Sequence, residues 1–162
     1  MKTEIKWGVI FSVMTILWIA LEKLTGLHDQ RIQWHPYLTN LIAIPAIWIY
    51  VLAIREKRQQ LGGQISFKQI LVFGLLVSVV VAALSPLAQW ICFTFITPNF
   101  FQNAIQAGVA QGQKLGDLQA FFNASSYRVQ GVVGALMIGL LTTLILGAIM
   151  RSKKPAAQTA SA

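Results

Sequence analysis

The length of its uncharged stretches constrains the fold of this sequence more than any other feature. No Asp, Glu, Lys or Arg occurs between Lys6 and Glu22, between Arg31 and Arg55, between Lys68 and Lys114, or between Arg128 and Arg151. A water-soluble helical bundle needs a polar face on every helix, and these stretches do not provide one. Only 11% of the residues are charged, too few to cover a soluble protein of 162 residues. The sequence therefore predicts an all-α polytopic integral membrane protein.

Four transmembrane helices are expected, at residues 5–24, 36–54, 69–96 and 129–150, because about 20 apolar residues cross a bilayer. Pro45 and Pro86 lie inside the second and third spans and predict bends there. Ser66 is placed to cap the third span. We expect residues 1–154 to form a single four-helix domain. A disordered tail rich in Ala, Gln, Thr and Ser is expected over residues 155–162.

The segment 97–128 is too rich in Gln, Asn and Gly to cross the membrane. Thr97 and Pro98 look like an N-cap and the first residue of a helix. Large apolar residues recur through the segment, which predicts an amphipathic hairpin or a pair of short helices at the membrane surface.

The distribution of cations predicts the orientation of the chain. Nine of the thirteen Lys and Arg residues fall on the side that holds both termini: Lys2, Lys6, Arg55, Lys57, Arg58, Lys68, Arg151, Lys153 and Lys154. Because cytoplasmic connections carry the excess of Lys and Arg, both termini are expected in the cytoplasm. The cations lie at the ends of apolar runs and form no basic face, so nucleic acid is not an expected partner.

Small residues recur every four positions along two of the predicted spans. Gly131, Ala135, Gly139, Thr143 and Gly147 form one stripe, and Gly74, Ser78 and Ala82 form the other. Such stripes allow helix backbones to approach closely. They either pack the third and fourth spans together within one chain, or present a surface to a partner helix or a second copy.

Polar residues within the predicted spans are few. Gln89 and Asn40 are interpreted as interhelical hydrogen-bond partners, and Cys92 as a small packing residue. No Asp, Glu, Lys, Arg or His lies near the centre of a predicted span. This pattern argues against a proton-coupled carrier, an ion pump or an intramembrane enzyme with an acid or histidine catalyst.

The first outer connection holds several ionisable residues: His28, Asp29, Arg31 and His35, with Glu22 just before them. Two histidines supply half of a zinc site, but their spacing fits no common metal motif. The connection is therefore interpreted as solvated, with Glu22 paired to Lys23 or Arg31 and no metal bound.

No catalytic or cofactor-binding constellation is evident. Ser125 and Ser126 have no acid or base placed by the sequence to activate them. Gly62 and Gly63 lack the Lys-Ser/Thr pair of a phosphate-binding loop. The sequence predicts that the chain is not an enzyme and binds no cofactor.

The connection before the third span resembles part of a known family. The residues that carry the resemblance are Gly62, Gly63, Ile65, Ser66 and Phe67, followed by Gly74 and by Pro98-Asn99-Phe100-Phe101. The family comprises bacterial four-span membrane proteins with a domain of unknown function. The resemblance implies a four-helix layout in the bacterial inner membrane and implies no activity.

The leading functional hypothesis is a non-enzymatic accessory, scaffold or assembly subunit that acts through helix–helix contacts. Its expected partners are the lipid bilayer and either another membrane protein or a second copy. The alternative is a small channel or transporter that works as a homo-oligomer, since four helices alone enclose little space.

Overall fold

The computed structural model describes residues 1–152, and every regular element within them is helical. The elements are α1 (Lys2–Leu24), η1 (Ile32–Trp34), α2 (His35–Leu38), η2 (Thr39–Ile42), α3 (Ala43–Gln60), α4 (Phe67–Ile91), η3 (Cys92–Ile96), α5 (Phe100–Ala110), α6 (Leu115–Phe121) and α7 (Ala124–Met150). Four helical stretches are long and apolar enough to cross a membrane: Lys2–Leu24, Ile32–Gln60, Phe67–Ile96 and Ala124–Met150. The expected all-α polytopic fold is confirmed, and the chain is a multi-pass membrane protein. The tail expected over 155–162 lies outside the described residues.

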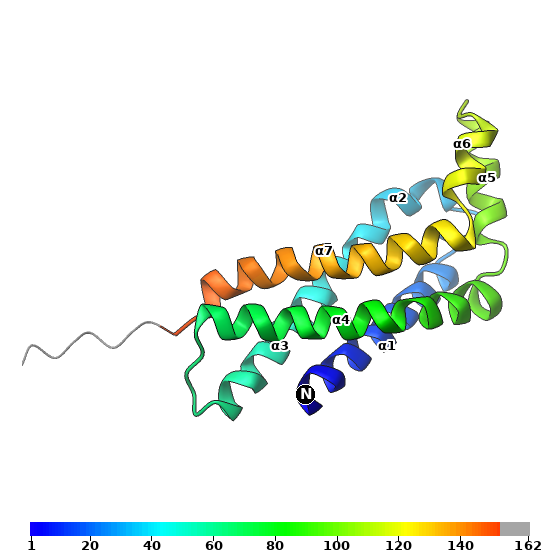
Figure 1. Ribbon diagram of the computed structural model, residues 1–162. Helices are drawn as coiled ribbons and strands as arrows, with labels where there is room; N and C mark the ends of the chain where they lie inside the picture. The colour runs from blue at the N-terminus through cyan, green and yellow to red at the C-terminus, as the bar shows by residue number, and fades with distance from the viewer. Residues whose placement is uncertain (153–162) are drawn as a thin grey trace, which may run out of the picture.

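Helix α4 is the centre of the bundle and packs most extensively on α7 and α1 (Figure 1). Helix α3 joins the core from Ile49 onward, where Ile49, Tyr50, Ala53 and Ile54 are buried. None of its residues from Ala43 to Trp48 is buried.

The apolar side chains divide between a core and an outward face. Phe73 and Val77 of α4 are buried with Ile54 of α3 at the centre of the bundle. Large apolar side chains such as Leu17, Ile44, Met137 and Ile149 are exposed on the outside. In a membrane this outer surface faces lipid tails, so its exposure carries no hydrophobic penalty.

Both ends of the described chain lie at the same end of the bundle as the α3–α4 connection. Lys57 of α3 donates to Glu4 of α1 at 2.8 Å, and Lys6 forms a 2.6 Å ion pair with Glu56. The backbone N–H of Ser152 donates to the carbonyl of Ile65 at 2.8 Å. We call this the inner end of the bundle and the opposite end the outer end.

The second membrane-crossing stretch is irregular near its outer end. Pro45 has no N–H to donate to the carbonyl four residues earlier, and the stretch just before it, η2, is a 3₁₀ helix. The irregularity expected at Pro45 is therefore present one turn earlier in the chain. Helix α3 also continues to Gln60, six residues beyond the expected end of the span.

The expected helix start at Thr97 and Pro98 is wrong. Helix α5 begins at Phe100, with Asn99 at the N-cap position. Thr97 lies two residues before that cap, and its hydroxyl lies 3.2 Å from His28 Nδ1. Helix α7 begins at Ala124, five residues before the expected span, since the Asn123 side chain accepts hydrogen bonds from two backbone N–H groups of its first turn.

The α3–α4 connection has the geometry that its sequence favours. Gly62 and Gly63 adopt φ of +78° and +88°, in a backbone region that residues other than glycine rarely adopt. Ser66 caps α4 as expected, and Gln69 completes a reciprocal capping box with it. Ile65 is only 1% exposed, and Phe67 lies against Gly147, so this connection packs onto the end of α7.

Candidate functional site

A buried carboxylate lies in the last turn of α1, at the outer end of the bundle. Glu22 is 3% exposed. The indole N–H of Trp18, one turn earlier on the same helix, donates to Glu22 Oε1 at 2.7 Å. A buried carboxylate is costly unless charged or hydrogen-bonded groups surround it. The expected partners Lys23 and Arg31 do not supply them, because Lys23 pairs with Asp29 at 2.6 Å and Arg31 donates to a backbone carbonyl.

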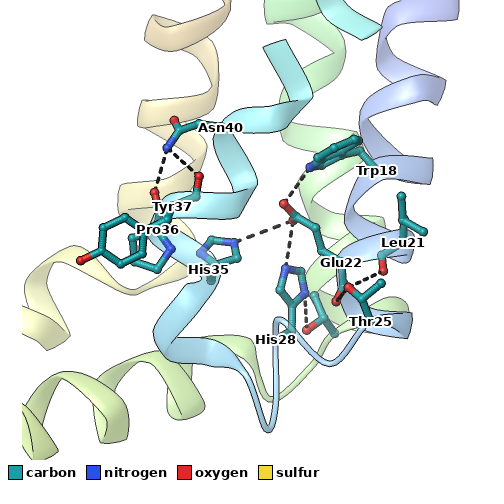
Figure 2. A network of polar contacts seen from close by, with 10 residues as sticks. Trp18, Leu21, Glu22, Thr25, His28, His35, Pro36, Tyr37 and Asn40 are labelled. Carbon is teal, nitrogen blue, oxygen red and sulfur yellow. Dashed lines mark hydrogen bonds and ion pairs between the residues drawn. The ribbon is translucent and has the colours of Figure 1, made fainter. Parts of the chain in front are cut away.

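Two imidazoles approach the second oxygen of this carboxylate (Figure 2). His28 Nε2 lies 3.1 Å from Glu22 Oε2, and His35 Nε2 lies 3.8 Å from the same atom. His28 is 2% exposed, so the prediction that it belongs to a solvated loop is wrong. His35 is half-buried. The three side chains offer one ligand atom each, and these atoms all lie within 4.8 Å of one another.

The chain reaches this arrangement through a tight turn after α1. Gly26 adopts φ of +80° and donates to the carbonyl of Lys23, while Leu27 donates to the carbonyl of Glu22. These two bonds form a Schellman motif, which ends the helix and reverses the chain. The reversal places His28 under Glu22. The chain then continues through η1 to α2, which brings in His35 next to Pro36.

The segment between α4 and α7 closes the site from outside. The Phe100 ring of α5 packs against the imidazoles of His28 and His35, with ring centroids 4.8 and 5.1 Å away. The Asn103 amide donates to the backbone carbonyl of His28 at 2.8 Å. Helices α5 and α6 stand across the outer end of α4 and α7 (Figure 1). The part of this segment around Phe100 therefore lies on protein.

A cavity of about 450 Å³ extends inward from the three side chains, between α1, α3, α4 and α7. It reaches as far as Tyr50 and Gly139. Its exposed lining residues are Asn40 and Ala43 on one side and Ile138 on the other, so it opens between the junction of η2 with α3 and helix α7. That opening lies on the flank of the bundle, which faces lipid in a membrane.

Gln89 and Asn40, the two amide residues expected to bond between helices, have different kinds of partner. Gln89 donates from α4 to the Tyr127 carbonyl of α7 at 2.8 Å, which confirms its expected interhelical role. Its Oε1 atom is buried without a hydrogen-bond partner in the described chain and belongs to a side chain that lines the cavity. Among residues 1–152, Asn40 bonds only to carbonyls of its own helical segment, so the interhelical role expected of it is wrong.

The two stripes of small residues meet inside the monomer. A Cβ added at Gly74 would collide with Thr143, and one at Gly139 with Ser78 and Tyr50. Gly131 lies against Ser85 and Gln89 in the same interface. Of the two interpretations left open by the sequence, packing of α4 on α7 within one chain is the one the contacts support. Ala82 is buried, and Ala135 is packed against the core.

Sequence reasoning did not anticipate the group formed by Glu22, His28 and His35. One signal was available: Glu22 follows Trp18 at i+4 on an apolar helix and precedes Gly26, which predicts a helix end with the carboxylate on the Trp18 face. Nothing local indicates Thr97, which is 69 residues from its partner His28.

A family model described as "Protein of unknown function (DUF4199)" matches residues 6–152. The match covers most of the chain and confirms the expected resemblance to an uncharacterised family. No curated protein and no solved structure matches the chain.

Proposed function

We propose that this chain, which belongs to the DUF4199 family of proteins of unknown function, binds a small amphipathic molecule inside the membrane. The single observation that carries the proposal is the cavity of about 450 Å³ with a polar outer end and an opening between α3 and α7. Ligand cavities typically measure about 300–1,000 Å³, with apolar walls and a few converging polar groups.

The chemistry of the walls supports an amphipathic ligand. The inner part of the cavity is lined by apolar and small residues such as Phe11, Val81 and Ala135. Its outer part holds the carboxylate, the two imidazoles and the Gln89 amide. A molecule with a hydrocarbon part and one polar group would match both parts, and it would enter from the bilayer without crossing water.

The role proposed is binding and not catalysis. The accessory-subunit and homo-oligomeric channel hypotheses remain predictions, but the small-residue stripes no longer supply them with a free surface, because those residues pack α4 on α7. We further propose that the chain lies in a bacterial inner membrane with its inner end in the cytoplasm. The excess of Lys and Arg at that end supports this orientation.

A cavity-filling substitution tests the proposal. Gly134 lines the cavity, and a Cβ added there would meet nothing within 4 Å. Gly134→Leu should therefore occupy the cavity without displacing the helices. Ala148→Leu adds the same side chain at an exposed position on the same helix and serves as the matched control.

The assay is labelling of the purified protein in liposomes by a fatty acid that carries a photoreactive diazirine, with the labelled residues located by mass spectrometry. Wild-type protein and Ala148→Leu should be labelled at cavity residues such as Val81 and Thr142. Gly134→Leu should lose that labelling and keep the labelling of lipid-facing residues. Equal cavity labelling in all three proteins, or labelling of lipid-facing residues alone in the wild type, would refute the proposal.

A further inference from the structure

We propose that Glu22, His28 and His35 form a binding site for a divalent cation of the zinc class, at the polar end of the cavity. Two imidazole nitrogens and one carboxylate oxygen are a ligand set that zinc takes in proteins when it keeps one position open. The inference concerns a cation and goes beyond the amphipathic ligand proposed above.

The geometry is close to that of a tetrahedral site. With metal–ligand bonds of about 2.0–2.1 Å, tetrahedral ligands lie about 3.3 Å apart. Glu22 Oε2 is 3.1 Å from His28 Nε2 and 3.8 Å from His35 Nε2, and no pair of the ligand atoms is separated by more than 4.8 Å. Small rotations of the His35 ring, which is half-buried and next to the cavity, would equalise these separations.

Outer partners hold two of the three ligands in place. The Trp18 indole donates to Glu22 Oε1, which leaves Oε2 directed at the imidazoles. Thr97 Oγ1 lies 3.2 Å from His28 Nδ1. A hydroxyl can donate or accept, so it can pair with His28 in the metal-free tautomer and also accept from Nδ1–H when Nε2 binds a metal. Partners of this kind fix the tautomer and orientation of metal-bound histidine.

Burial of the carboxylate is an independent observation that points to a cation. Glu22 is 3% exposed, and no Lys or Arg pairs with it in the described chain. A carboxylate in such surroundings is stabilised when a cation binds next to it. All three side chains also line the cavity, so the fourth position of a bound metal would face the space in which a ligand can lie.

The chain is well suited to a direct test, because His28 and His35 are its only histidines and Cys92, its only cysteine, is fully buried. The full-length protein should be purified in mild detergent with a tag that contains no histidine, and stripped with a chelator. Zn²⁺ binding is then measured by equilibrium dialysis. We expect one zinc per chain, and X-ray absorption of that zinc should show two imidazole ligands.

Three variants and a control assign the site. Glu22→Gln and His35→Gln should each weaken zinc binding by about 100-fold or more, since each removes a ligand. Thr97→Val, which keeps the shape and removes the hydroxyl, should weaken it by about 10–100-fold. Asp117→Asn removes one negative charge from an exposed position on α6, an element that carries none of the three ligands, and should leave the affinity unchanged.

The result that overturns the proposal is the absence of stoichiometric zinc in the wild type, equal affinity in the wild type and the ligand variants, or an absorption spectrum without imidazole. The spectrum of the wild type decides the matter even where a variant fails to fold. The dialysis needs no amphipathic ligand, and the lipid labelling needs no zinc. Failure of one proposal is therefore distinguishable from failure of the other.

Discussion

The contact between α4 and α7 at Gly139 allows a stability prediction to be worked from the structure. A Cβ added at Gly139 would lie 2.8 Å from Ser78 Cβ and 2.8 Å from the Tyr50 hydroxyl, against 3.4–4 Å for ordinary contacts. Ser78 Cβ is fixed to the α4 backbone and cannot turn aside. Gly139→Ala therefore forces the two helices apart or displaces the 2.7 Å hydrogen bond between Tyr50 and Ser78.

Gly134, five residues earlier on α7, is the matched reference. A Cβ added there meets nothing within 4 Å, and both changes replace helical glycine by alanine. The gain in helix propensity, about 1 kcal/mol in water, therefore cancels between the two variants. What remains is overpacking, about 1–3 kcal/mol, and a weakened hydrogen bond, about 1 kcal/mol. Gly139→Ala should be less stable than Gly134→Ala by about 3 kcal/mol.

The assay is equilibrium unfolding in mixed micelles of dodecyl maltoside and increasing SDS, followed by far-UV circular dichroism. The free energy of unfolding is compared among wild type, Gly134→Ala and Gly139→Ala. If the two variants unfold at the same SDS fraction, the close approach of α4 and α7 at Gly139 is refuted. If Gly134→Ala were destabilised and Gly139→Ala were not, the assignment of the open cavity to the Gly134 side of α7 would be wrong.

Three further outcomes are expected. Asn123→Ala should lower the free energy of unfolding by about 1 kcal/mol in the same SDS titration, because it removes the side-chain cap of α7, and Asn123→Ser should restore most of that loss. Gly62→Ala should lower the free energy of unfolding by about 1–2 kcal/mol because φ is +78° there. Gly116→Ala, at a helical glycine with open space around it, should not lower it, and equal losses in the two variants would contradict the left-handed turn. Cys92 is completely buried, so a maleimide should label it only after SDS unfolding. Rapid labelling of the folded protein would contradict the buried position of Cys92 in η3.

Much of the architecture follows from local patterns in the sequence. A helix satisfies all backbone N–H and C=O groups within its own segment, as the bilayer requires. The four membrane-crossing stretches were therefore predictable from their uncharged, apolar composition and their approximate length. The capping of α4 by Ser66 was predictable for the same reason: the cap and the backbone groups it satisfies lie within one turn. The start of α5 was not predictable, because the Thr97 hydroxyl bonds to a residue in another connection.

The pairing of the two small-residue stripes shows where local information ends. Their spacing predicts close helix packing, but spacing is the same for a partner in the same chain and for one in another chain. Only the positions of Ser78 and Thr143 opposite Gly139 and Gly74 decide that the contact is internal.

The candidate site belongs wholly to the tertiary structure. The sequence determined that Glu22, His28 and His35 lie near the outer end of a membrane bundle, since they flank its apolar runs. It could not determine that they converge, because their side chains come from a helix end, a reversed turn and a second short helix. Phe100 and Asn103, more than 70 residues further along the chain, contribute to the burial of the site by packing on His28 and bonding to its carbonyl. Long-range packing of this kind leaves no periodic trace in a sequence, so only the folded chain reveals the site.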